Sequence, residues 1–116
     1  MSRDLYNNII EVTDIRGILV VCEKSRWEEH IILHPEVKGK EEVVKNTIKE
    51  PEVIYQSAEY KERDVYFGKM EEDNKYMKVI VEMSAPNCGE VITAFVRKDI
   101  SGNIDTKVIK YDKSKL

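Results

Sequence analysis

Arg26 and His30, four residues apart, are the first pair of side chains in this sequence that could do chemistry. On a helix this spacing places both on one face. An arginine can bind a phosphate through two hydrogen bonds, and a histidine titrates near neutral pH and can transfer a proton. The pair could therefore begin a phosphodiester-cleaving site. Periodicity alone favours the alternative, a solvated helix face with His30 at the boundary of the core.

Arg63 and Tyr66 form a second candidate pair, three residues apart in a segment rich in strand-forming residues. Arg63 could hold a phosphate, and Tyr66 could donate to an oxyanion or stack on a base. The commoner roles of such residues are a surface charge and a half-buried aromatic of a strand.

Thr93 and Lys78 complete the set of candidate site residues. The hydroxyl of Thr93 could orient a phosphate oxygen or a ribose hydroxyl, and Lys78 could add a positive charge from a neighbouring strand. Both residues are also ordinary strand residues, so their types alone do not establish a role.

Metal and cofactor chemistry has little support in the sequence. It contains two histidines, His30 and His34, and two cysteines, Cys22 and Cys88, which lack a CxxC spacing. Phosphate-binding glycine loops and zinc-protease signatures are absent. We therefore expect two free thiols, no metal and no cofactor.

Composition points to one domain, residues 1–116, in the cytoplasm. The length of 116 residues suits a single core. The sequence contains no run of 18 apolar residues, so we expect no membrane-spanning helix. The first residues show no secretory signal. The net charge is −3, which argues against nucleic-acid binding through bulk positive charge but leaves room for a local basic cleft.

Two helices are expected before the main run of strands. Ser25 and Glu28 have the spacing of a capping box, which predicts a helix from Arg26 to Leu33 or His34, ended by Pro35. A second helix is predicted over 40–49, with apolar residues on one face and Pro51 after it.

The remaining elements are predicted strands. Alternating or apolar runs predict strands at 9–12, 17–22, 53–55, 64–67, 76–83, 91–97 and 106–111. Turn residues at 14–17, 71–74, 86–89 and 101–103 separate several of them. We therefore predict an α+β fold, in which two helices pack on a four- to five-stranded antiparallel sheet with an N-terminal β-hairpin.

The order of these features resembles the nuclease-like domains of the barnase–EndoU–colicin–RelE superfamily that are found in phages and mobile elements. The similarity covers about residues 18–98, as Arg26-Trp27-x-x-His30, His34-Pro35-Glu36, Ile48-x-x-Pro51-x-x-Ile54, Arg63-x-Val65-Tyr66-Phe67, Tyr76-x-Lys78-Val79-Ile80-Val81 and Val91-Ile92-Thr93-Ala94-Phe95.

This resemblance implies a toxin-like or phage-associated endoribonuclease that cleaves tRNA or mRNA without metal, through attack of the ribose 2′-hydroxyl on the phosphate. It would make His30 the acid and base and Thr93 and Arg63 its catalytic partners, with Arg26, Tyr66 and Lys78 binding the substrate. An antitoxin or immunity protein would be a partner.

Two other functions stay open on the same fold. A non-catalytic RNA- or protein-binding module predicts that these residues diverge or are held in salt bridges. An inhibitor or antitoxin predicts an acidic or apolar patch in place of a basic cleft.

Overall fold

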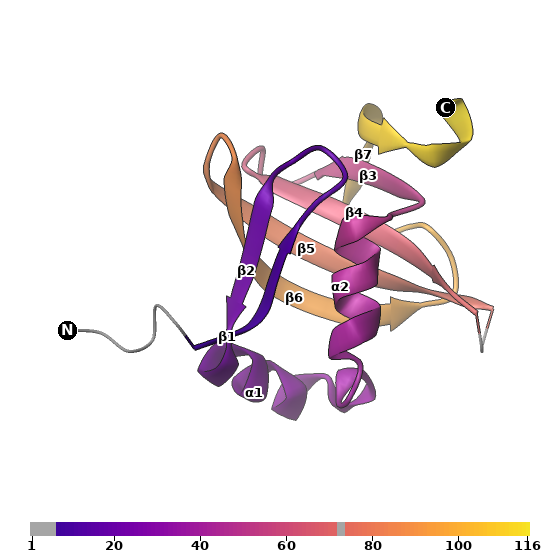
Figure 1. The fold of residues 1–116 in the computed structure, drawn as a ribbon. Coiled ribbons are helices and arrows are strands. Elements are labelled where there is room, and N and C mark those ends of the chain that lie inside the picture. The colour runs from indigo at the N-terminus through magenta and orange to yellow at the C-terminus, as the bar shows by residue number, and fades with distance from the viewer. Residues whose placement is uncertain (1–6, 72–73) are drawn as a thin grey trace.

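The computed structural model describes residues 7–71 and 74–116, and Figure 1 shows their arrangement. In these residues seven strands form one mixed sheet in the order β1-β2-β6-β5-β4-β3-β7. The strands are β1 (Asn8–Thr13), β2 (Leu19–Glu23), β3 (Val53–Ser57), β4 (Arg63–Met70), β5 (Lys75–Ala85), β6 (Cys88–Arg97) and β7 (Ile104–Asp112). The helices are α1 (Lys24–Leu33) and α2 (Glu41–Lys49), with short 3-10 turns η2 (Pro35–Val37) and η3 (Lys113–Lys115).

The α+β class, the two helices and the N-terminal hairpin are confirmed, but the expected antiparallel sheet of four or five strands is wrong. The predicted strand segments all lie in one seven-stranded sheet, because β2 pairs in parallel with β6 through Leu19–Val21 and Cys88–Glu90. Local patterns cannot reveal a pairing between segments so far apart along the chain. The predicted edge strand is β7, which pairs with β3.

The capping box at Ser25 is also wrong. Helix α1 begins at Lys24 with Glu23 as its N-cap, and no side chain caps it. The chain passes from β2 into α1 without a linker, and the Lys24 amide donates to the Asn7 carbonyl at 3.0 Å. Because a backbone carbonyl already takes this terminal N–H, Ser25 lies inside the helix.

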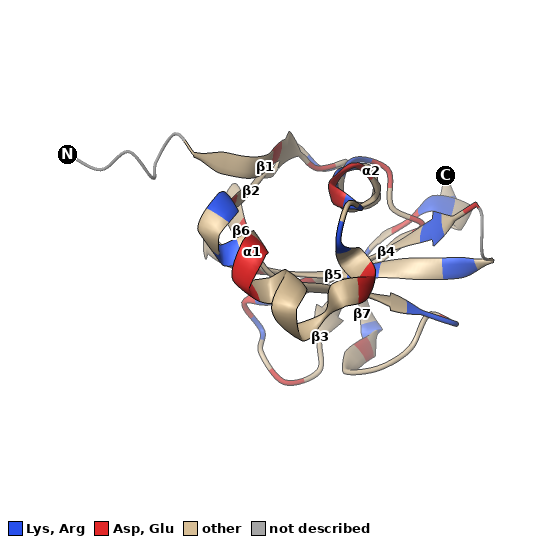
Figure 2. Ribbon diagram, turned by 90° about the horizontal axis from the view of Figure 1, so that it is seen from below, with Lys and Arg blue, Asp and Glu red and all other residues tan. Residues whose placement is uncertain are grey.

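The main core lies between the sheet and its helical cover. Helix α2 packs on β1, β4 and β5, so it closes the space between the N-terminal hairpin and the centre of the sheet (Figures 1 and 2). The buried side chains there include Trp27, Val44, Ile48, Tyr66 and Val79. Burial of such apolar side chains contributes about 1.5 to 3 kcal/mol each.

A smaller core lies on the other face of the sheet. Val53, Val65 and Phe67 are buried there, and Ile100 and Ile104 pack over them from the chain that leads into β7. Strand β4 is therefore covered on both faces, which explains why its sequence is nearly continuous in apolar residues rather than alternating.

The turn expected at 71–74 includes Glu72 and Asp73, which lie outside the described residues. In the part of the chain that the structure describes, none of the helices has the length and apolar character needed to cross a membrane.

Gly68 allows α2 to approach β4 closely. A Cβ built on Gly68 would lie 2.9 Å from the Thr47 Cβ and would also meet the Thr47 hydroxyl oxygen. The same hydroxyl donates to the Val43 carbonyl at 2.8 Å, so it is held in place on the helix. The absence of a side chain at Gly68 therefore sets the distance between α2 and the sheet.

We expect Gly68→Ala to lower the free energy of unfolding by about 1 to 3 kcal/mol, because the added methyl group overpacks the contact with Thr47. Urea denaturation would measure the loss. Lys69→Ala is the matched control, since Lys69 is the exposed next residue of the same strand. Equal stability of Gly68→Ala and the parent would show that α2 can move away at no cost.

Candidate functional site

His30 lies on α1 with its ring against the backbone of β6. Its Nε2 atom is 2.7 Å from the Ala94 carbonyl oxygen and 3.0 Å from the Ala94 amide nitrogen. On this side β6 is paired with β2 only through Cys88–Glu90, so the edge of β6 is open at Ala94. The imidazole occupies the position that a neighbouring strand would take. It covers backbone groups that would otherwise be free to pair with a strand of another chain.

A row of rings fixes the position of this histidine. The ring centroids lie 5.7 Å apart for Trp27 and His30, 4.7 Å for His30 and His34, and 5.5 Å for His34 and Phe95. Burial lowers the pKa of His30, the hydrogen bond with the Ala94 carbonyl opposes that effect, and the net shift is downward. His30 is thus held as a neutral ring with its Nε2 engaged by the backbone.

Arg26 and Arg63 lie in one row of charges across the sheet. Arg63 Nε donates to Glu82 at 3.0 Å, and Arg26 Nη2 is 3.7 Å from Glu90. Glu82 and Glu90 are directly opposite each other in the pairing of β5 with β6. Two carboxylates in these positions repel, so each arginine compensates one of them. Both predicted phosphate-binding residues are therefore engaged within the protein.

Tyr66 points into the main core, where it takes part in a buried charged network. Its hydroxyl donates to Asp14 at 2.7 Å and accepts from Arg16 Nη2 at 3.0 Å. The same Arg16 atom bonds Asp14 at 2.9 Å and Asp64 at 2.8 Å, and Lys110 reaches Asp64 at 3.2 Å. Burial and the bond to Asp14 raise the pKa of Tyr66, so its proton stays on the phenol.

Sequence reasoning did not find this network. It read Asp14 and Arg16 as turn residues, which they are, since the Gly17 amide donates to the Asp14 carbonyl at 3.0 Å. The available signal was Asp64, a charged residue at the start of the apolar run Val65-Tyr66-Phe67. A carboxylate in a strand covered on both faces requires a cationic partner from elsewhere in the chain.

Thr93 and Lys78 lie on neighbouring strands. Thr93 precedes Ala94 on β6 and pairs with Ile80, so the structure brings it close to the contact made by His30. Lys78 is buried, and its Nζ donates to the carbonyls of Ser101 and Gly102. His30 therefore contacts the backbone next to Thr93, and Lys78 lies opposite Phe95 in the same stretch of β6.

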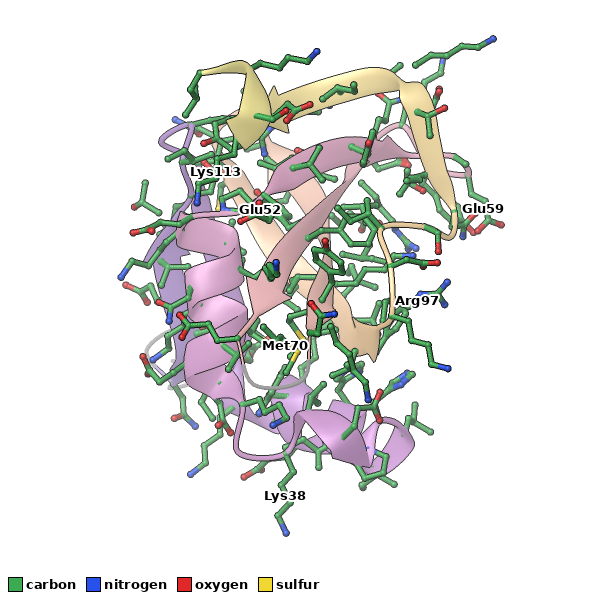
Figure 3. The ribbon with its side chains drawn as sticks, turned by 90° about the vertical axis from the view of Figure 1, so that its right-hand side faces the viewer. Lys38, Glu52, Glu59, Met70, Arg97 and Lys113 are labelled. Atoms are coloured by element: carbon green, nitrogen blue, oxygen red, sulfur yellow. The ribbon has the colours of Figure 1, made fainter. Side chains whose placement is uncertain are left out.

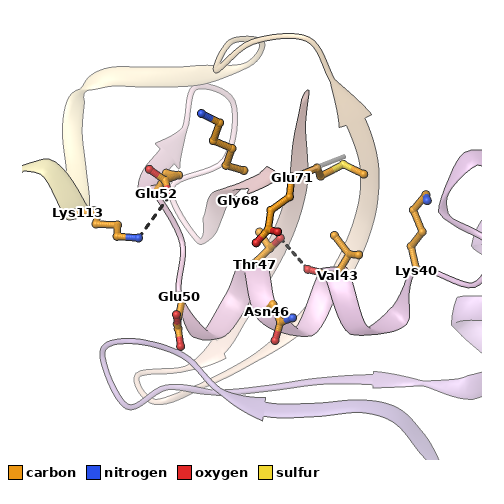
Figure 4. A pocket seen from close by; sticks show the side chains of 11 residues that line it. Lys40, Val43, Asn46, Thr47, Glu50, Glu52, Gly68, Glu71 and Lys113 are labelled. Atoms are coloured by element: carbon orange, nitrogen blue, oxygen red, sulfur yellow. Dashed lines mark hydrogen bonds and ion pairs between the residues drawn. The ribbon is translucent and has the colours of Figure 1, made fainter. Parts of the chain in front are cut away.

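An open hollow of about 690 Å³ lies between α2 and the end of β4 (Figure 4). Thr47 and Gly68 line its floor, and Glu52 and Lys113 form an ion pair of 3.7 Å at its side, which Figure 3 also shows. The charges in this hollow compensate one another. Elsewhere too, within the described residues, no group of three histidine, cysteine, aspartate or glutamate side chains could hold a metal ion.

Comparison of the chain with protein-family models, with curated proteins and with solved structures found no match. The resemblance to the barnase–EndoU–colicin–RelE superfamily therefore stays a prediction.

The depressed pKa of His30 gives a pH dependence of stability. The unfolded chain takes up a proton near the ordinary pKa of 6.5, whereas folded His30 resists protonation, so the free energy of unfolding falls as the pH drops below 6.5 through the folded pKa. Thermal unfolding between pH 7.5 and 4.5 would measure this slope. His30→Leu should flatten it near pH 6, and an unchanged slope would contradict the assignment.

Removal of Arg16 should be more damaging than removal of Lys110. Arg16→Met leaves the buried carboxylates of Asp14 and Asp64 without their shared cation, which should cost on the order of 3 kcal/mol. Lys110→Met removes a single contact to Asp64 from a partly exposed side chain and should cost under about 1 kcal/mol. Urea denaturation of both variants at pH 7 would test the difference, and equal losses would contradict it.

Proposed function

We propose that this chain is a non-catalytic protein-binding domain that docks to a partner through the C-terminal half of α1. The observation that carries this proposal is a pair of adjacent apolar residues on that helix, Ile32 and Leu33, which are 80% and 76% exposed. Single exposed apolar residues are common, but two large ones side by side on a helix are typical of a contact surface.

The packing of α1 supports this role. Of its ten residues, all of them described, only Trp27 is fully buried. Glu28 and Glu29 are exposed one turn before Ile32 and Leu33, on the side of the helix that faces away from Trp27. This surface combines two apolar side chains with two carboxylates, so it would fit an apolar groove with basic residues at its rim.

The charge distribution supports protein binding over RNA binding. Basic and acidic segments are interspersed along the ribbon in Figure 2, and the net charge is −3. Because Arg26 and Arg63 are paired with glutamates, a phosphate bound at either one would lie beside a carboxylate that repels it. An acidic inhibitor or antitoxin acting on a partner with a basic surface accords with these features.

A metal-independent endoribonuclease acting on tRNA or mRNA is the second candidate. The proximity of His30 to the β6 segment that carries Thr93 favours it, since a proton-transfer group and a hydroxyl near one phosphate would suit 2′-hydroxyl attack. In that function His30 would have to release the Ala94 backbone when RNA binds.

The α1 surface can be tested with a photo-crosslinking residue. Installed at Ile32 in the producing cell, it should trap one defined partner protein, whereas the same residue at Ile109, which is 46% exposed on β7, should not. Ile32→Glu with Leu33→Glu should weaken binding of that partner by at least about 100-fold, the loss expected from a central apolar contact. Because both side chains lie in solvent, stability should change by no more than about 0.5 kcal/mol.

Different results would overturn the docking surface and establish the endoribonuclease. No crosslink specific to Ile32, or binding that the double variant leaves intact, would overturn the docking surface. Cleavage of tRNA or a short RNA in EDTA, leaving cyclic-phosphate ends, and its loss in Thr93→Val as well as His30→Ala, would establish the endoribonuclease instead. Thr93→Val matters because His30→Ala also removes a structural contact.

A further inference from the structure

Lys78 is an unusual buried charge. It lies on β5 with 2% of its surface exposed, under the loop that joins β6 to β7. Its Nζ donates to the Ser101 carbonyl at 3.1 Å and to the Gly102 carbonyl. The same atom lies 5.6 Å from the ring centroid of Phe67 and 5.3 Å from that of Phe95. These groups solvate the ammonium, but none of them carries a negative charge.

The counter-ion of Lys78 is missing from the described residues. Over 7–71 and 74–116 no carboxylate lies within ion-pair distance of its Nζ, whereas Asp14, Asp64, Glu82 and Glu90 are each within that distance of a cationic side chain. A buried charge is normally paired, because its transfer out of water is costly. This buried ammonium therefore has no carboxylate partner among the described residues.

A second cation lies beside it. The position that a Cβ of Gly102 would take is 2.9 Å from Lys78 Nζ and 3.3 Å from Arg97 Nη2, so both groups reach the same exposed glycine. Arg97 lies on the side of the sheet away from α2 (Figure 3), and it donates to the Ser101 hydroxyl at 3.0 Å. Ser101 in turn donates to Asp99, which contacts Arg97 only through that hydroxyl.

The surface beside this point is hollowed, at Arg97 rather than over Lys78 or Gly102. A depression of about 340 Å³ is lined by Arg97, Lys98, Asp99 and Ser101, together with Val96. Gly102 has no side chain, so the backbone of Ser101 and Gly102 covers Lys78, whose Nζ donates to both carbonyls. A φ of +92° at Gly102 also disfavours replacement by a residue with a Cβ.

We propose that Lys78 and Arg97, with the loop 98–103 around them, form a binding site for a phosphate group. A tetrahedral oxyanion beside Gly102 could accept from the guanidinium and, in place of one of the two loop carbonyls, from the ammonium, and it would supply the negative charge that the buried lysine lacks. The site is separate from the α1 surface, so it does not depend on the proposed protein partner.

The buried charge of Lys78 costs folding stability, which is consistent with a role in binding. Burial, with a further contribution from Arg97, lowers the pKa of Lys78 to about 8. The unfolded chain therefore holds this proton more tightly than the folded protein, so the lysine reduces stability at neutral pH and this cost is relieved as the pH rises past 8. An anion bound beside Lys78 would stabilise the charged form and raise its pKa.

The test is a titration of the full chain with potassium phosphate near pH 7, with potassium chloride holding the ionic strength constant. We expect saturable NMR shifts confined to the amides of 97–103 and the Lys78 Cε group. At saturation the pKa of Lys78, followed through Cε, should be higher by about one unit, the effect of an opposite charge in contact. Adenosine monophosphate in a parallel titration distinguishes the source: tighter binding than inorganic phosphate indicates a nucleotide, and equal binding indicates the phosphate group alone.

Variants make the assignment specific. Lys78→Met and Arg97→Gln should each weaken phosphate binding by about tenfold or more, the loss expected for one charged hydrogen-bond donor. Lys69→Met, an exposed lysine on the neighbouring strand, should leave binding unchanged. The melting temperature of Lys78→Met should be no lower than that of the parent, which verifies its fold. Shifts that do not saturate with either ligand, or phosphate binding that survives both substitutions, would overturn the proposal.

Discussion

The contact of Arg16 with two buried aspartates holds the two halves of this sheet in their relative positions. Arg16 and Asp14 lie in the turn of the β1–β2 hairpin, and Asp64 and Tyr66 lie on β4, so the network joins elements that are not neighbours in the sheet. Because every buried polar side-chain atom of the described residues has a hydrogen-bond partner, the network carries little unsatisfied polarity. It fixes the hairpin over the main core, and that in turn places α1 and His30 beside β6.

The position of the hairpin determines how the edge of β6 is covered. Once the hairpin is held over the core, β2 pairs with β6 only over Cys88–Glu90 and then leads into α1. The edge of β6 beyond this point needs a cover, and His30 and η2 provide it. Trp27, the one buried residue of α1, anchors the helix and donates to Glu41 of α2 at 3.0 Å. Because Trp27 is the one fully buried residue of the helix, most of α1 faces solvent and exposes Ile32 and Leu33.

The sequence allowed prediction of the local elements and of the antiparallel pairing between consecutive strands, but not of the parallel pairing that joins the hairpin to the rest of the sheet. The strand at 76–83 and the helix at 40–49 carry clear periodicity, and each was found within a few residues of β5 and α2. The parallel pairing of β2 with β6 leaves no local signal, and the start of α1 depends on a carbonyl from Asn7 rather than on a capping side chain. The candidate site could not be predicted for a similar reason. Residue type suggested phosphate chemistry for Arg26 and Arg63, but in the fold each arginine lies against a glutamate of another element, Glu90 or Glu82.

Charge compensation distinguishes the structural cations of this protein from Lys78 and Arg97, the two that we assign to binding. Arg16, Arg26 and Arg63 each lie against a carboxylate, so their removal would leave an acid without a partner. Lys78 is more deeply buried than any of them, its Nζ contacts carbonyls and rings, and the charged group near it is the cation Arg97 rather than a carboxylate. A charge in that position lowers stability, and natural chains depart from local consistency of this kind chiefly at functional sites. The same reasoning assigns His30 to the fold, because its Nε2 lies against the Ala94 backbone and satisfies one of the two groups that would otherwise be left open.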